Sequence, residues 1–200
     1  IPGSLRFDFD NDIREHNTPL PHMMPTPEFF AEEMRKLGVN KDSAIVAYDN
    51  VGVYASPRAW WMFRAMGHEN VAVLDGGLPA WSGAGYETSP TLATSSLRGS
   101  FASKPRPESF VDSQAVTHAL SDSAFSVVDA RSAGRFTGQE PEPRAGLRGG
   151  HMPGSVSMPI GETQINGVMA AEQAGLKELA VYDGSWAEWG AADSGLPVVK

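Results

Sequence analysis

Few residue types in this chain could carry chemistry, and arginine is the most informative of them. The 200 residues include no cysteine, which excludes disulfides and thiol chemistry for the residues present. The five histidines have no metal-ligand spacing, and no P-loop or dinucleotide fingerprint occurs. Two arginines, Arg135 and Arg144, lie in a charged loop from Ala130 to Gly150. Arginine can grip a carboxylate at two points, although in acidic, proline-rich loops it more often forms a solvated surface ion pair.

Composition narrows the class of protein. The hydrophobic content of 41% is ordinary for a globular protein, and no apolar run reaches the roughly 18 residues needed to span a bilayer. No basic and apolar leader opens the sequence. The net charge of −8 argues against nucleic acid and anionic lipid as partners. We expect a cytoplasmic protein with no metal and no organic cofactor.

The chain nearly repeats itself, which predicts two related domains. Pro2–Ser4 recurs as Pro153–Ser155, 151 residues later, whereas a second set of residues recurs after only 108. The second copy is therefore 43 residues shorter than the first, with the interruption between about Ser155 and Ala170. The residues that recur after 108 positions are Gly67, Val73, Asp75, Gly76 and Trp81, matched by Gly175, Val181, Asp183, Gly184 and Trp189.

The first copy alternates strands and helices. A helix is expected from Thr26 to Gly38, then a buried strand at Ala44–Tyr48. A second helix should run from Ser56 to Gly67, and a second strand at Val71–Leu74. The pattern predicts an α/β fold of two tandem domains, each a mainly parallel sheet with helices on both faces.

The second copy follows a stretch rich in Thr, Ser and Pro from Glu87 to Glu108, which is typical of an extended linker. A helix near Ser113–Leu120 and a strand at Phe125–Asp129 then begin it. We assign residues 1–90 to a first domain that lacks its N-terminal part, 91–108 to a linker, and 109–200 to a second domain interrupted near 166–170. An interior strand, loop and helix cannot be dropped without exposing a sheet edge, so we expect the natural polypeptide to contain residues missing from this sequence.

Several segments, in this order along the chain, resemble the two-domain rhodanese family, and most closely its 3-mercaptopyruvate sulfurtransferases. The resemblance covers nearly the whole chain. The segments are Ile1–Ser4, Ser56–Arg64, Leu74–Gly77, Val128–Arg131, Gly134–Phe136, Glu140–Arg144, Gly150–Ser155 and Tyr182–Gly190.

The resemblance implies a nucleophilic cysteine in a strand-to-helix loop of the second domain. The 43-residue gap covers that loop, so we expect the cysteine among the residues absent between about Asn166 and Ala170. The first-domain equivalent is Asp49–Ala55, where Asp49 stands about where the cysteine would be. Backbone N–H groups at a helix N-terminus form an anion cradle, which lowers the pKa of a thiol placed there.

The resemblance also implies substrate-binding residues. Arg135 and Arg144 match the pair of arginines that hold the carboxylate of the substrate, and an arginine at 144 favours 3-mercaptopyruvate over thiosulfate. Asp10 and His22 match first-domain residues that reach the active cleft in mercaptopyruvate-type members. The alternative is that Asp10 caps a helix or lies on the surface, and that His22 is a loop histidine.

The resemblance implies an enzyme that moves sulfur from 3-mercaptopyruvate, through a cysteine persulfide, to a thiol or cyanide acceptor. A reducing partner protein would fit that cycle. A thiosulfate-preferring sulfurtransferase is a lesser alternative. A different class, an inactive rhodanese-like binding module, would follow if these 200 residues were the whole polypeptide.

Overall fold

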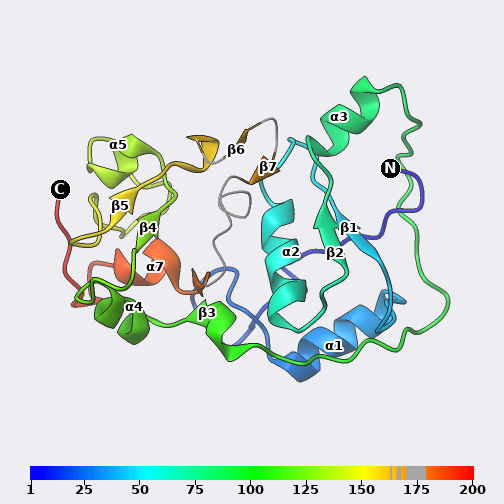
Figure 1. The fold of residues 1–200 in the computed structure, drawn as a ribbon, viewed down its shortest axis with the longest axis horizontal. Coiled ribbons are helices and arrows are strands. Elements are labelled where there is room, and N and C mark those ends of the chain that lie inside the picture. Colours follow the sequence, from blue (N-terminus) through cyan, green and yellow to red (C-terminus); the bar gives the residue numbers. More distant parts are fainter. Residues whose placement is uncertain (163, 166–167, 170–178) are drawn as a thin grey trace. The chain divides into compact units, whose positions relative to one another are not determined.

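The computed structural model describes residues 1–162, 164–165, 168–169 and 179–200, and the chain divides into two compact units. Unit 1 consists mainly of residues 1–18 and 22–107, and unit 2 mainly of the described residues within 108–165 and 169–200. Figure 1 labels most of the helices and strands of both. The chain thus has two units, as the repeat predicts.

Unit 1 contains the predicted strand–helix–strand motif. Strand β1 (Ile45–Ala47) pairs in parallel with β2 (Val71–Val73). Helix α2 (Ser56–Ala65) connects them and packs against both (Figure 1). Helix α3 (Gly77–Gly83) follows β2, and α1 (Pro27–Lys36) precedes β1. The parallel pairing through a helical crossover confirms the α/β class.

The core of unit 1 is aromatic. The ring centroids of Phe30 and Phe63 lie 5.3 Å apart, and Phe101 lies 5.7 Å from Phe30 and 6.0 Å from Phe63. Met34 of α1 and Met62 of α2 are fully buried beside these helices' other apolar residues. Edge-to-face ring packing of this kind stabilises a core beyond the area it buries.

The segment that the sequence predicts as a linker is fastened to unit 1. Residues 91–106 form neither helix nor strand, yet Phe101 is only 1% exposed. The Phe101 amide donates to the Val39 carbonyl at 3.0 Å, and the Arg106 amide donates to the Ala65 carbonyl at 2.7 Å. Residues up to 107 therefore belong to unit 1 as a packed extended segment (Figure 1).

Strand β1 departs from the expectation of a buried strand. Val46 is 61% exposed, whereas Ile45 and Ala47 on the opposite face are partly covered. Successive side chains of a strand point to opposite faces, and α2 covers only one of them. The described residues of unit 1 thus leave the Val46 face of the sheet open.

Unit 2 is built from shorter elements. Helix α4 (Ser113–Ala119) begins at Asp112, whose carboxylate accepts from the Ala115 amide at 2.9 Å. The predicted strand at Phe125–Asp129 is shorter than expected, because only Val128–Asp129 is paired. Besides α4, the described α-helices and strands from residue 108 onward are β3 (Phe110–Val111), β4 (Val128–Asp129), α5 (Ala133–Phe136), β5 (Val156–Ser157), β6 (Gln164–Ile165), β7 (Val168–Met169), β8 (Val181–Tyr182) and α7 (Ser185–Trp189), of which β7 is divided between the two units.

The sheet of unit 2 is divided. Strand β3 pairs in parallel with β8, and β4 pairs in parallel with β5, as two separate two-stranded sheets. In the repeat, β8 corresponds to β2, because Val181 matches Val73. The partner of β2 is β1, and among the described residues no strand takes the equivalent place beside β8.

The core of unit 2 lies between α4 and α7. Trp186 and Trp189 of α7 are buried together with Val116 of α4 and Met152. The indole N–H of Trp189 donates to the Pro197 carbonyl at 2.8 Å, and that of Trp186 donates to the Arg148 carbonyl at 3.0 Å. These bonds satisfy the indole N–H groups of two buried tryptophans, and they hold the residues around Pro197 and Arg148 to α7.

Candidate active site

In unit 1, the loop from Asp49 to Ser56 wraps around a carboxylate. Oδ2 of Asp49 accepts from the amides of Tyr54, Ala55 and Ser56 at 2.8, 2.9 and 3.0 Å, and from the Ser56 hydroxyl at 2.9 Å. Oδ1 accepts from the Val51 amide at 3.1 Å. An anion cradle exists at the start of α2, as expected, and the side chain of Asp49 fills it.

The charge of Asp49 is stabilised by these donors. Partial burial alone would raise the pKa of Asp49, but the hydrogen bonds from Ser56, Tyr54 and Val51 outweigh it and lower the pKa to about 2. Asp49 is therefore an anion at neutral pH, bound by the same loop geometry that would stabilise a thiolate.

In unit 2, Arg135 lies in α5 and is joined to Glu142. Its Nη2 and Nε both donate to Oε2 of Glu142, at 2.6 and 3.1 Å. The side chain of Glu142 is 1% exposed, and that of Arg135 is 28% exposed. The Nε and Nη2 edge of the Arg135 guanidinium is thus bound to Glu142, while the side chain remains partly accessible to solvent.

Arg131 supports the same carboxylate from the other side. Its Nη1 donates to Oε1 of Glu142 at 2.7 Å, and its Nε donates to Oδ1 of Asp129 at 3.0 Å. Its Nη2 donates to the Gly150 carbonyl at 2.7 Å, and its guanidinium carbon lies 3.8 Å from the centroid of the Trp186 ring. A cation over an indole face, with each N–H edge bonded to a carboxylate, is a firmly anchored arginine.

Arg144 lies on the loop that contains Glu142, two residues farther along, and is exposed. This loop and Arg135 follow β4, so both predicted arginines belong to the segment that leaves the carboxyl end of that strand. In parallel sheets, ligands bind at that end of the strands.

Asp10 and His22 of unit 1 lie together. Nδ1 of His22 is 2.7 Å from Oδ1 of Asp10, and the Phe9 ring stands edge-on to the imidazole with 5.7 Å between centroids. His22 has a φ of +60°, which is uncommon for a residue other than glycine and is typical of functional or tightly constrained positions. The predicted approach of this pair to the substrate stays a prediction.

Asp129, Arg131 and Glu142 were not predicted as site residues. Two signals were available, since Val128–Arg131 and Glu140–Arg144 are among the segments of the family resemblance. Glu142 lies seven residues after Arg135 on an irregular loop, so no periodicity in the sequence indicates that the two side chains pair. The predicted position of the cysteine, between about 166 and 170, lies largely outside the described residues.

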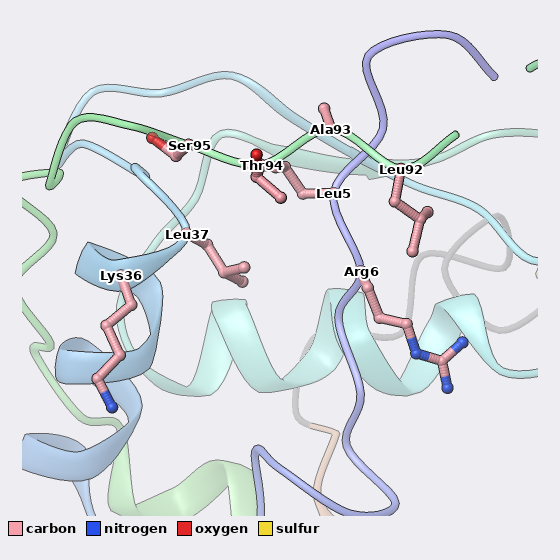
Figure 2. Close-up of a pocket in the computed structure, with 8 residues that line it drawn as sticks. All are labelled: Leu5, Arg6, Lys36, Leu37, Leu92, Ala93, Thr94 and Ser95. Atoms are coloured by element: carbon pink, nitrogen blue, oxygen red, sulfur yellow. The ribbon is translucent and has the colours of Figure 1, made fainter. Parts of the chain in front are cut away.

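Other candidate sites are weaker. A cavity of about 290 Å³ in unit 1 is lined mainly by apolar atoms of Leu5, Leu37, Leu92 and Ala93. Figure 2 shows the charged ends of Arg6 and Lys36 far apart at its border, and each forms an ion pair, with Asp8 at 2.8 Å and Glu33 at 2.6 Å. Within the described ranges, no cluster of three metal-ligating side chains occurs, and no helix is long and apolar enough to cross a membrane.

Comparison with known proteins identifies the class. Residues 1–84 match the Rhodanese-like domain family. The chain is 34% identical to the 3-mercaptopyruvate sulfurtransferase of Escherichia coli over 238 positions, which cover 99% of this chain and 82% of that protein. The chain therefore belongs to the rhodanese family, and within it to the sulfurtransferase enzymes.

Two further relatives extend the comparison. The mitochondrial Thiosulfate/3-mercaptopyruvate sulfurtransferase 1 of Arabidopsis thaliana is 32% identical over 255 positions, covering 99% of this chain and 67% of that protein. The crystal structure of Tum1 from Saccharomyces cerevisiae superposes with a TM-score of 0.85 at 28% identity, covering 97% of this chain and 83% of that one. Since one relative is mitochondrial, the cytoplasmic location stays a prediction.

Proposed function

We propose that the protein takes sulfur from 3-mercaptopyruvate through a cysteine persulfide and passes it to a thiol or to cyanide. The observation that carries the proposal is the arrangement of Arg135 and Arg144 on the segment after β4, with Arg135 held by a buried carboxylate. The donor named for the E. coli relative has a carboxylate beside a ketone, which suits a pair of arginine side chains.

The chemistry is a transfer between sulfur atoms. A cysteine thiolate attacks the sulfur of 3-mercaptopyruvate, and the carbon–sulfur bond breaks with its electron pair left on carbon as the enolate of pyruvate. Protonation of the enolate gives pyruvate, and the cysteine retains a persulfide. An acceptor thiolate or cyanide then attacks the outer sulfur and restores the cysteine. Arg135 and Arg144 would hold the carboxylate and stabilise the enolate charge beside it.

The cysteine must lie in a segment that the present sequence does not contain. Three observations support such a segment: the 43-residue mismatch between repeats, the place beside β8 that no described strand takes, and the length of the alignments. The alignment with the E. coli relative has 238 positions against 200 residues here, so at least 38 positions lack a residue of this chain. The segment would supply the missing strand, the cradle loop and a helix.

Mass spectrometry of the intact natural protein tests this proposal. We expect a mass several kDa above 21.4 kDa, at least one thiol that reacts with iodoacetamide, and release of pyruvate from 3-mercaptopyruvate when cyanide is present. A mass near 21.4 kDa with no reactive thiol would overturn it and favour the inactive binding module, because a cysteine-free protein cannot form a persulfide. A thiosulfate-preferring enzyme would release thiocyanate faster from thiosulfate and cyanide than from 3-mercaptopyruvate and cyanide.

A further inference from the structure

We infer that Glu142 is a positioning residue, which selects the edge of the Arg135 guanidinium that faces the substrate. This inference rests on the proposed carboxylate-binding role of Arg135. It is carried by the geometry of four side chains, Asp129, Arg131, Glu142 and Arg135, called here the charge chain.

The two oxygens of Glu142 have separate partners. Oε1 accepts from Arg131 at 2.7 Å, and Oε2 accepts from Arg135 at 2.6 and 3.1 Å. With a side chain only 1% exposed, Glu142 has little room for another rotamer. A rotation that improved one of these contacts would break the other, so the carboxylate is fixed in place.

The far end of the charge chain is anchored to the fold. Arg131 is 10% exposed, bonds to Asp129 at the end of β4, and lies over the Trp186 ring. Trp186 belongs to the buried core of unit 2. The position of Glu142 is therefore set by a strand and by the core, although Glu142 itself lies in an irregular loop.

At the other end of the charge chain, Glu142 determines which N–H donors of Arg135 remain for a substrate. A guanidinium has five N–H donors, and the edge formed by Nε and Nη2 faces Glu142. Among the described residues, Nη1 of Arg135 has no hydrogen-bond partner. The edge formed by Nη1 and Nη2 is thus the one left for a substrate carboxylate, and Glu142 keeps it there before the substrate arrives.

Charge balance agrees with this role. The charge chain holds two carboxylates and two guanidiniums, so it is neutral before the substrate binds. Arg135 then attracts an anion through its directed N–H groups more than through an unbalanced positive charge. This arrangement favours a planar carboxylate, which can accept two parallel hydrogen bonds, over anions of other shapes.

The test uses the natural polypeptide, in which we expect the sheet to be complete, and pyruvate binding to it requires no turnover at the cysteine. Pyruvate, the carboxylate product of the proposed reaction, is titrated into the ¹⁵N-labelled polypeptide and followed by NMR. We expect Glu142→Gln to weaken pyruvate binding about tenfold, because its amide can accept from only one arginine. Glu140→Gln is the matched control, since Glu140 lies in the same loop but bonds Ser132, and it should change binding less than about twofold.

A double-mutant cycle separates positioning from folding. Once Arg135→Ala has removed the guanidinium, adding Glu142→Gln should weaken pyruvate binding by less than about twofold more. An equal loss in both backgrounds would mean that Glu142 acts on the fold alone, and would overturn the inference. If Glu142→Gln does not fold, Glu142→Asp keeps the charge, shortens the side chain and is tested in the same cycle.

The Nε–H resonance of Arg135 gives a readout that needs no ligand. In the unaltered chain this proton should be protected from exchange with water, and Glu142→Gln should broaden or shift it. An unchanged resonance would overturn the inference whatever pyruvate does. Two other outcomes would count against the proposed function: Arg135→Ala binds pyruvate as well as the parent protein does, or the parent protein does not bind pyruvate. In either case the Nε–H resonance still tests the role of Glu142.

Discussion

The carboxylate of Asp49 is bound by Ser56 through both of its donors, the backbone N–H at 3.0 Å and the side-chain hydroxyl at 2.9 Å. Ser56 is the first residue of α2 and is buried. Asp49 therefore supplies the N-terminal capping contact that the preceding residue, Ala55, does not supply with its side chain.

Replacing this carboxylate should destabilise unit 1. Asp49→Asn keeps the size of the side chain but replaces an acceptor oxygen by an amide group, so some of the N–H donors lose their partner. We expect a loss of about 1–3 kcal/mol in the free energy of unfolding, measured by urea denaturation. Asp42→Asn, at an exposed aspartate of the same unit, should change it by less than about 0.5 kcal/mol. Equal losses for the two variants would refute the capping role.

The same contact predicts a dependence on pH. The pKa of Asp49 is about 2 in the folded chain, whereas an unperturbed aspartate, as in the unfolded chain, has a pKa of 3.8. Between these two pH values the folded state therefore binds fewer protons than the unfolded state. The stabilisation is complete above about pH 4 and is lost as the pH falls toward 2. In acid titrations followed by circular dichroism, Asp49→Asn should flatten this part of the stability curve. A curve of unchanged steepness would contradict the prediction.

The cradle of unit 1 should also activate a thiol. The 200-residue chain has no cysteine, so Asp49→Cys introduces a single thiol whose reactivity can be measured without background. We expect its pKa to fall below the ordinary value of about 8.5, because the loop amides stabilise the thiolate. The rate of alkylation by iodoacetamide against pH measures it, with Asp42→Cys as the exposed control. Identical pH profiles would show that the cradle does not act on a thiol.

Phe101 should anchor the segment 91–106 to unit 1. Because Phe101 is 1% exposed and packs against Phe30 and Phe63, Phe101→Ala should cost about 3–5 kcal/mol of unfolding free energy. Leu97→Ala is the control from the same segment, because Leu97 is 79% exposed and should cost under about 0.5 kcal/mol. A small effect at Phe101 would mean that the segment is a free linker.

Arg144 should distinguish between sulfur donors. In the natural polypeptide, Arg144→Ala should raise KM for 3-mercaptopyruvate by about 10- to 150-fold, the value of a charge-assisted hydrogen bond of about 1.5–3 kcal/mol. KM for thiosulfate, which has no carboxylate, should rise much less. Equal increases for both donors would leave Arg144 with a general effect on anions only.

Periodicity and capping residues predicted the framework of the fold. Thr26 caps its helix as its residue type suggests, and the apolar runs near Ile45 and Val71 form a parallel pair. These features depend on neighbours in the sequence, which is why they could be predicted. The exposure of Val46 could not be predicted, because it depends on which face of the sheet α2 covers.

The site was predicted less completely than the fold. Arg135 and Arg144 were found through motifs, and their chemistry follows from the guanidinium group. The carboxylate that holds Arg135 comes from a loop without regular structure, where neither spacing nor hydropathy indicates a contact. The burial of Phe101 was missed for a similar reason, since a segment rich in Ser, Thr and Pro has the composition of a free linker.

The divided sheet of unit 2 has a consequence for handling the 200-residue chain. Among the described strands, β8 and β4 each pair on one side only, and Val128, Val156 and Val181 are exposed. Unpaired backbone groups next to exposed valines are a template for pairing with another molecule. The chain should therefore self-associate as its concentration rises, and a polypeptide that contains the missing strand should remain monodisperse. The sedimentation behaviour of the two would then report whether the sheet is complete, independently of any assay of sulfur transfer.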